Sequence, residues 1–234
     1  MTRSRSTSPL ITHPASIAVG AALLAIVLLM LFLDPAVGRW ESTVAGTAWV
    51  QTFWSFVKPF GREMIQGLFI LGLLIAAAVS RSWGYARLAL VVGVAYAISG
   101  TTCHLIKMAV HRPRPEVMRL PWVGGWGVAA CMIENELHSF PSGDVTIAAS
   151  LATVMFLAIG RGRARYVLFL IPFLSAVGRI VVAAHYPSDC LAGALLGMAT
   201  AVLVWRWLMP GAGSTGGPGY ATPESVTTSS CTPR

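Results

Sequence analysis

Long apolar runs are the feature of this sequence that most limits its fold. A helix needs roughly 20 apolar residues to cross a membrane, and six stretches come close to this length: 15–33, 64–80, 88–110, 142–160, 166–184 and 189–208. Charged residues make up only 11% of the chain, whereas soluble domains carry about 25%. We therefore predict an all-α polytopic membrane protein with six transmembrane helices in a lipid bilayer.

The six stretches form one predicted membrane domain, residues 15–209, between two polar ends. Residues 1–14 are predicted to be a cytoplasmic segment. Residues 210–234 are rich in Gly, Ser, Thr and Pro, which is typical of a disordered tail. The first apolar stretch is long and lacks a convincing cleavage site, so we interpret it as a retained span rather than a signal peptide.

Arginine placement predicts how the domain is oriented. Cytoplasmic loops are enriched in Arg and Lys, and arginines stand at alternate ends of the stretches, at Arg3, Arg5, Arg81, Arg87, Arg161, Arg163 and Arg165. We therefore predict that both termini are cytoplasmic. The excess of arginine over lysine is typical of a GC-rich bacterial genome. We expect the protein in the inner (plasma) membrane of a bacterium. The net charge of +8 fits this topology or an attraction to anionic lipid headgroups, and no long basic patch indicates nucleic acid as a partner.

Aromatic residues cluster between the first two stretches, at Trp40, Trp49, Phe53, Trp54 and Phe56. Their spacing is typical of one face of a helix that lies on the membrane surface, where aromatic rings settle at the headgroup level. We interpret the segment as an interfacial anchor, and the alternative is a lateral gate for a lipid substrate.

Three polar clusters lie at the predicted outer ends of the stretches, and the first contains Lys107 and Arg114. Pro113 and Pro115 prevent the helix from continuing, so Arg114 is expected in extended chain. A lysine supplies a point charge and an arginine a planar fork, and both suit phosphate oxygens. Arg112 adds positive charge on the same predicted outer side of the membrane. The rule that positive residues gather in cytoplasmic loops does not explain this charge, whereas an anion-binding site would require it. The alternative is that these side chains only reach toward the membrane interface.

The second cluster opens the fourth stretch and consists of Pro141, Ser142, Gly143 and Asp144. Free N–H groups and the positive end of a helix dipole favour phosphate at such a position. Gly143 removes a side chain where the backbone would approach an anion. The alternative is an ordinary capped helix start without a ligand.

The third cluster contains Arg179, His185 and Asp189. A cation in mid-membrane is costly, so Arg179 is expected to face the protein interior. Asp189 is expected to fold back on His185 across the tight turn at Tyr186-Pro187. A carboxylate bonded to one ring nitrogen leaves the other nitrogen free as a nucleophile. A single histidine at the end of a span is more often structural. The interpretation of His185 as a nucleophile therefore depends on its expected pairing with Asp189.

Taken in order, the three clusters resemble the signature motifs of the type 2 phosphatidic acid phosphatase (PAP2) family. The match is Lys107-x6-Arg114-Pro115, then Pro141-Ser142-Gly143, then Arg179-x5-His185-x3-Asp189. The resemblance implies a six-helix membrane phosphatase that works without a metal or other cofactor. It implies a phosphohistidine on His185, oriented by Asp189, and a phosphate held by Lys107, Arg114, Ser142, Gly143 and Arg179.

Two positions depart from the family pattern. Gly178 stands where the family usually has Ser, which removes at most one hydroxyl contact. Asp144 stands where the family has the histidine that protonates the leaving alkoxide, a step typically worth about 10²–10⁴-fold in rate. We take Asp144 as the candidate acid in its place. His138, a better leaving group or a loss of activity are the alternatives.

The arginine pattern places the predicted active site on the extracytoplasmic side, and the resemblance implies a phosphorylated membrane lipid as substrate. The lipid classes are a phospholipid, a prenyl phosphate or pyrophosphate, and a phosphorylated glycolipid. One alternative is a phosphotransferase that passes the phosphoryl group to another lipid, and a second is a non-catalytic phospholipid-binding protein. The His185–Asp189 pair favours an enzyme, because a binding protein has no use for an oriented nucleophile. The sequence favours no particular lipid or oligomeric state.

Overall fold

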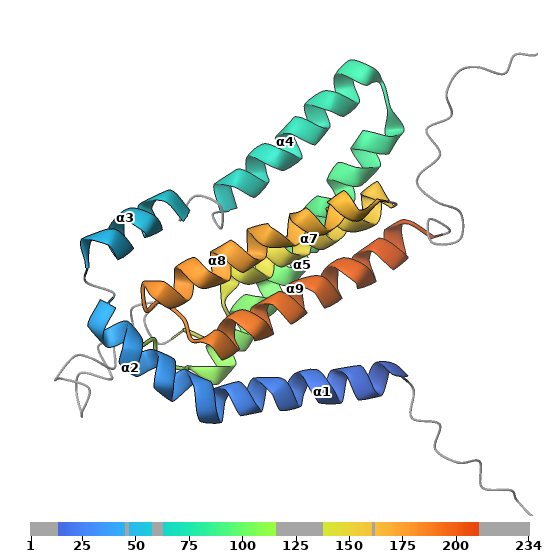
Figure 1. Ribbon diagram of the computed structural model, residues 1–234. Coiled ribbons are helices and arrows are strands. Elements are labelled where there is room, and N and C mark those ends of the chain that lie inside the picture. Colours follow the sequence, from blue (N-terminus) through green and yellow to red (C-terminus); the bar gives the residue numbers. More distant parts are fainter. Residues whose placement is uncertain (1–13, 45–46, 58–62, 116–137, 161, 211–234) are drawn as a thin grey trace, which may run out of the picture.

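The computed structural model describes residues 14–44, 47–57, 63–115, 138–160 and 162–210, and all regular secondary structure in these ranges is helical (Figure 1). This confirms the predicted all-α fold. Within the same ranges, four helices are long and apolar enough to cross a membrane: Ile17–Trp40, Trp83–Val110, Arg163–Val181 and Pro187–Leu208. Two further apolar helices, Gly67–Ser80 and Gly143–Ile159, are shorter. The predicted polar ends, 1–14 and 210–234, lie almost entirely outside the described residues.

The first apolar stretch continues as a helix beyond its predicted end. It comprises α1 (Pro14–Leu28), the π-helical turn η1 (Leu29–Leu33) and α2 (Asp34–Val44). A π-helical turn interrupts the regular hydrogen-bond ladder and is a common cause of a kink. In Figure 1, α1 and α2 meet at an angle at this turn. The angle brings the start of α2 to the end of the bundle where the polar clusters lie.

The next three helices are α3 (Ala48–Val57), α4 (Glu63–Ser80) and α5 (Trp83–Val110). Helices α4 and α5 form a hairpin whose tight turn contains Arg81 in a left-handed conformation, with φ 51°. Helix α5 ends at His111, which is also left-handed. The chain after it is not helical up to Arg114, as the prolines in this segment predict.

The remaining helices are α7 (Gly143–Ile159), η5 (Arg163–Phe169), α8 (Leu170–Val181) and α9 (Pro187–Leu208). Helices α7 and α9 pack closely because two glycines of α9 face the backbone of α7. A Cβ atom on Gly193 would lie 2.6 Å from the Ser142 carbonyl oxygen, and one on Gly197 would clash with the Thr146 carbonyl oxygen. Small residues four apart permit such close approach between membrane helices. The approach holds the N-terminal ends of α7 and α9 side by side.

The apolar core occupies the end of the bundle away from these N-termini. It joins α5, α7 and α9 through Leu88, Val91, Val92, Ala95, Val154, Ala201, Val204 and Trp205. At the same end, the Arg87 guanidinium donates to the Leu208 carbonyl oxygen at 2.6 Å, which satisfies an exposed carbonyl at the C-terminus of α9. The bundle therefore has an apolar end and a polar end.

Candidate active site

The polar end of the bundle gathers all three clusters predicted from the sequence. The Ser142 amide, at the start of α7, donates to the Asp189 carbonyl oxygen at 3.0 Å. The His185 amide donates to the Arg179 carbonyl oxygen at 3.2 Å, and Lys107 Nζ donates to the His138 carbonyl oxygen at 2.7 Å. The C-terminal ends of α5 and α8 thus meet the N-terminal ends of α7 and α9 (Figure 1).

His185 and Asp189 form a buried pair at this end. His185 is 4% exposed and Asp189 is fully buried. Their closest atoms, Nδ1 of His185 and Oδ2 of Asp189, are 3.8 Å apart, which is longer than a hydrogen bond. Ser139 lies beside both, because its Oγ donates to Asp189 Oδ2 at 2.5 Å and is 3.4 Å from His185 Nδ1. The predicted neighbours are therefore brought together, with a serine that the sequence did not indicate.

The start of α9 fixes the position of the Asp189 carboxylate. The Tyr186 amide donates to Asp189 Oδ2 at 2.9 Å, and the Asp189 amide donates to the Tyr186 carbonyl oxygen at 3.0 Å. Pro187 occupies the first helical position, where its missing N–H costs nothing. An acidic side chain in the first turn commonly accepts from the residue that precedes the helix. The local sequence thus accounts for the place of Asp189.

His185 is neutral at pH 7 in this environment. Burial lowers the pKa of His185 to about 4, because the charged imidazolium is poorly solvated there, and attraction to Asp189 raises it by less. The positive charges of Lys107 and Arg114 lower the pKa of His185 further. A neutral imidazole with its Nδ1 proton toward Asp189 presents the lone pair of Nε2. A neutral imidazole with a free lone pair is the form that can act as a nucleophile.

Arg179 and Asp144 are in direct contact. The Arg179 guanidinium, in the last turn of α8, forms an ion pair with Oδ2 of Asp144, in the first turn of α7. The same guanidinium lies 4.8 Å from the ring centroid of Trp54 on α3. The predicted aromatic segment therefore contacts Arg179, a predicted phosphate ligand. The predicted acid, Asp144, is paired with the same arginine.

The start of α7 offers donors that the described protein does not use. The Ser142 side chain is buried, and its Oγ has no hydrogen-bond partner among the described residues. A Cβ atom on Gly143 would be 3.9 Å from the nearest side chains, Cys103 and Lys107, which is ordinary contact. Packing within the protein therefore does not require glycine at position 143. Gly143 and Lys107 line a pocket at the first turn of α7, and a helix N-terminus beside a cation suits an anion.

His138 is poorly suited to act as the substitute acid. Burial lowers the pKa of His138, and the neighbouring His111 and Lys107 lower it further. An imidazole with a pKa below its usual 6.5 is mostly unprotonated at neutral pH, whereas a general acid must carry a proton.

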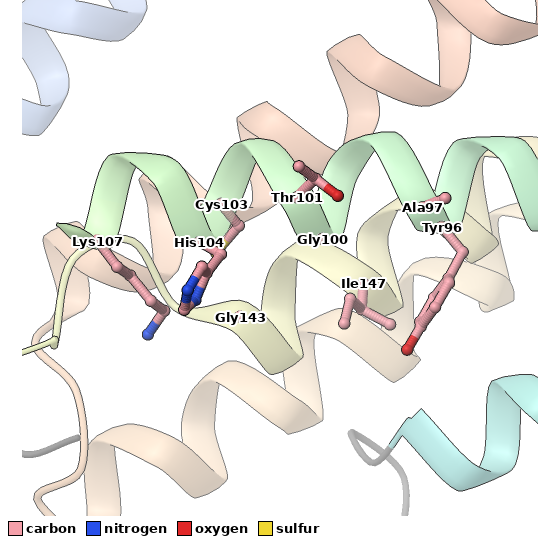
Figure 2. A pocket seen from close by; sticks show the side chains of 9 residues that line it. All are labelled: Tyr96, Ala97, Gly100, Thr101, Cys103, His104, Lys107, Gly143 and Ile147. Atoms are coloured by element: carbon pink, nitrogen blue, oxygen red, sulfur yellow. The ribbon is translucent and has the colours of Figure 1, made fainter. Parts of the chain in front are cut away.

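A pocket of about 470 Å³ begins at this end and runs along α5 (Figure 2). Lys107 and Gly143 line its end at the polar clusters, and Tyr96 and Ile147 line the other. Its lining is more apolar than polar, and several of its residues on α5 are exposed. The pocket therefore links the polar end of the bundle to the membrane-facing side of α5 and α7.

Three site residues were missed by the reasoning from sequence: Ser139, Arg112 as a partner of Asp189, and Asp34. Arg112 Nη1 donates to Asp189 Oδ1 at 2.5 Å, and Arg112 Nη2 donates to Asp34 Oδ2 at 2.8 Å. Asp34 had a usable signal, because an acidic residue directly after an apolar run suggests function. Ser139 had none, since serine is common in loops.

Comparisons with known proteins agree with the all-helical fold. The crystal structure of LpxE from Aquifex aeolicus is 23% identical, with a TM-score of 0.57, and the match covers 74% of this chain and 95% of that one. A PAP2-type phosphatidylglycerolphosphate phosphatase from Bacillus subtilis is 18% identical, with a TM-score of 0.57 and coverage of 80% and 94%. Among curated protein sequences, none matches significantly. The family model of the PAP2 superfamily matches residues 88–210, more than half of the chain, and the chain therefore belongs to the PAP2 superfamily.

Proposed function

We propose that this protein is a membrane lipid phosphatase that cleaves a phosphomonoester or pyrophosphate of a lipid through a phosphohistidine on His185. The observation that carries the proposal is a buried, neutral imidazole beside a buried carboxylate, at the bundle end where three cations also lie. Membership of the PAP2 superfamily supports it. The fold likeness to two solved structures, one of which is named as a phosphatase, is consistent with it.

The proposed reaction has two steps. In the first, Nε2 of His185 attacks phosphorus, the P–N bond forms, and the P–O bond to the lipid breaks. The leaving oxygen takes a proton from the Asp144 carboxyl, and Asp189 stabilises the positive charge on the phosphorylated imidazole. In the second, water gives a proton to the Asp144 carboxylate and attacks phosphorus, the P–N bond breaks to return the neutral imidazole, and inorganic phosphate leaves. A covalent intermediate of this kind divides one difficult displacement into two easier ones.

The phosphate would be held by Lys107, Arg114 and Arg179, with the Ser142 hydroxyl, which has no partner among the described residues, and the backbone N–H at Gly143. Fixed cations and N–H groups stabilise charge as it develops on the phosphoryl oxygens. Three protein cations would supply the positive charge for which other phosphatases use metal ions, so we propose that the reaction is metal-independent.

Asp144 remains our candidate for the general acid, with a condition that comes from its ion pair. While the Arg179 guanidinium is paired with Asp144, only part of its hydrogen-bonding capacity is available to phosphate. Phosphate would compete for the guanidinium, and the released Asp144 carboxylate would take up a proton that it could then donate to the leaving oxygen. A non-catalytic phospholipid-binding protein would show the same ion pair. Measuring phosphate release separates that protein from an enzyme that uses Asp144 as its acid.

The substrate is proposed to be a phospholipid or another phosphorylated lipid of the membrane. The pocket along α5 gives an apolar part of the substrate a place beside the phosphate site. The printed name of the Bacillus subtilis protein makes phosphatidylglycerol phosphate the first lipid to test. Phosphatidic acid, undecaprenyl pyrophosphate and lipid A are the other members of the panel.

We also propose that the active site faces the periplasm or exterior of a bacterial inner membrane and that both termini are cytoplasmic. Arg81 lies at the α4–α5 turn, and Arg87 contacts the C-terminus of α9. These arginines stand at the bundle end opposite His185, which supports the orientation under the positive-inside rule.

Phosphate release by the purified protein tests the proposal. The lipid panel is offered with EDTA present, to wild type, to His185→Asn and to His111→Asn. His111 is an exposed histidine in a left-handed conformation that asparagine tolerates, so it is the matched control. Release by wild type and His111→Asn but not by His185→Asn is expected. Binding of a lipid without release would favour the binding protein, and transfer of phosphate to a second lipid would favour the transferase.

A further inference from the structure

A buried carboxylate lies at the end of the first membrane helix. Asp34 begins α2 and is 2% exposed. The preceding turn, η1, contains no buried residue among those described, and its Leu31, Phe32 and Leu33 are exposed. A charge that is withdrawn from solvent on an otherwise outward-facing helix needs strong partners to offset its lost hydration.

The partners of Asp34 come from the two segments that form the active site. Arg112, between α5 and Arg114, donates to Oδ2 at 2.8 Å. The Ser188 amide, at the start of α9, donates to Oδ1 at 3.2 Å, and the Ser188 hydroxyl donates to Oδ2. Asp34 therefore joins the first helix to both segments at once.

Arg112 continues the connection to the catalytic pair. Its Nη1 donates to Asp189 Oδ1 at 2.5 Å and to Ser188 Oγ at 2.7 Å. Its guanidinium also lies 4.2 Å from the ring centroid of Tyr186. Burial lowers the pKa of Arg112, but Asp189 and Asp34 more than offset this and raise it overall. The result is a series from Asp34 through Arg112 and Asp189 to His185.

The charges in this series determine what Asp189 can do. One guanidinium facing one carboxylate would neutralise it, and little negative charge would then remain for the imidazole. Two carboxylates around one guanidinium carry a net negative charge, part of which faces His185. The other charged groups around His185 are Lys107 and Arg114, and both oppose a positive imidazole.

We propose that Asp34 is a positioning residue for His185, which holds Arg112 in place and balances its charge so that Asp189 can stabilise the phosphorylated imidazole. The proposal rests on the function proposed above for His185. It gives the first membrane helix, which lies outside the PAP2 match at 88–210, a part in catalysis. The competing explanation is that Asp34 only fastens α2 to the bundle.

Asp34→Asn separates these explanations by a measurement that needs no substrate. Exchange of the His185 C2–H hydrogen, followed by mass spectrometry across pH in the full-length detergent-solubilised protein, gives the pKa of that histidine. Removing the negative charge of Asp34 leaves Asp189 as the remaining carboxylate that offsets the positive charge of Arg112. Less negative charge then faces His185, and its imidazolium form is less stable. The pKa of His185 is expected to fall below its wild-type value. An unchanged pKa would overturn the proposal, whether or not the protein is a phosphatase.

A double variant checks that the effect passes through Arg112. Asp34→Asn/Arg112→Gln removes both charges and returns the full charge of Asp189 to His185. The pKa of His185 is therefore expected to rise again relative to Asp34→Asn alone. If Asp34→Asn lowers the pKa of His185 as much in an Arg112→Gln background as in wild type, the effect does not pass through Arg112, and that result would also overturn the proposal.

Activity gives the second readout. With a lipid that wild type hydrolyses, Asp34→Asn is expected to lower kcat about 10- to 100-fold, as for other residues that orient a functional histidine through an intermediate, with little change in KM. Asp34→Glu restores the carboxylate and should recover most of the loss. A kcat equal to wild type in Asp34→Asn would count against the proposal, whereas an inactive wild type would count against the phosphatase function only.

Discussion

The two carboxylates of the candidate site sit in opposite surroundings. Asp189 is fully buried and accepts hydrogen bonds from Ser139, Arg112 and the Tyr186 amide. The Asp144 side chain is 24% exposed, and its partner is the Arg179 side chain, which is 19% exposed. The region that we propose orients the nucleophile is thus buried and held by several hydrogen bonds, whereas the region that we propose protonates the leaving group is partly exposed.

This difference follows from how each carboxylate is placed. Asp189 is held by three segments of the chain, so moving it would leave several buried polar groups unsatisfied, each at a cost of about 1–3 kcal/mol. Under the proposed function, Asp144 would lose Arg179 when phosphate binds, and both side chains are partly exposed. We therefore expect substitutions near Asp189 to affect every substrate alike, and substitutions at Asp144 to depend on the leaving group.

The largest effect is expected at Asp189. Asp189→Asn retains the size of the side chain but removes the charge that stabilises the phosphorylated imidazole and selects its tautomer. In a comparable histidine–carboxylate pair this substitution costs about 10⁴-fold in kcat. Single-turnover phosphate release measures the loss. A reduction of less than about tenfold would show that Asp189 is not needed to orient the nucleophile.

The next effect is expected at Asp144. Asp144→Asn should lower the rate about 10²–10⁴-fold on a lipid phosphomonoester, whose alkoxide needs a proton, in line with the usual contribution of a general acid. An aryl phosphate has a leaving group that needs little protonation, so its rate should change far less. Equal losses on the two substrates would remove Asp144 as the acid. Asp144→His should retain activity with a different pH–rate profile.

A smaller effect is expected at Ser139. Ser139→Ala removes the hydrogen bond to Asp189 and leaves the carboxylate in place, and a hydrogen bond to a charged group is worth about 1.5–3 kcal/mol. We expect roughly a tenfold loss in kcat, which corresponds to about 1.4 kcal/mol. Ser150→Ala is the matched control, because Ser150 is a buried serine of α7 whose hydroxyl has no partner among the described residues. A similar loss in both variants would indicate general destabilisation.

The smallest effect is expected from moderate acid. The pKa of His185 is about 4, so between pH 7 and pH 5 nearly all of it stays unprotonated and nucleophilic. After correction for ionisation of the substrate, kcat/KM should fall less than about twofold over this range, whereas an ordinary histidine with a pKa near 6.5 would lose most of its activity. A fall that follows a pKa of 6 to 7 would show that His185 is not in the buried environment described.

Protonation of His185 also links pH to folding. Its pKa is lower in the folded protein than in the unfolded chain, so the unfolded chain binds a proton more readily as the pH falls. Protonation of His185 does not affect the free energy of unfolding above about pH 6.5. As the pH falls toward 4, it lowers the free energy of unfolding by up to about 3 kcal/mol. Thermal unfolding of wild type and His185→Asn across this range should differ in pH dependence.

The parts of the structure that local sequence determines were predictable. The apolar runs became helices, and the Tyr186-Pro187 turn brings Asp189 to within 3.8 Å of His185, because the two are only four residues apart. The end of the first helix was not predicted, since α2 continues past position 33 after a π-helical turn. Two apolar runs also form shorter helices than the other four described.

The long-range contacts of the site were beyond prediction from one sequence. Arg112 and Asp34 are 78 positions apart and Ser139 and Asp189 are 50 apart, and no local pattern indicates which distant partner a polar side chain will meet. The Asp144–Arg179 ion pair is of the same kind. The sequence indicated candidate residues for phosphate chemistry, and packing of the helices decides how these residues are paired.

The most direct test of the account is to trap the phosphoenzyme. Wild-type protein is mixed with a lipid labelled with ³²P in its phosphate, in EDTA, and is quenched in alkali, which preserves phosphohistidine. Peptide mapping should place the label on His185, with none in His185→Asn, and the label should disappear in acid. Phosphate release with no label on His185 at any quench time, or label on another residue, would contradict the proposed mechanism.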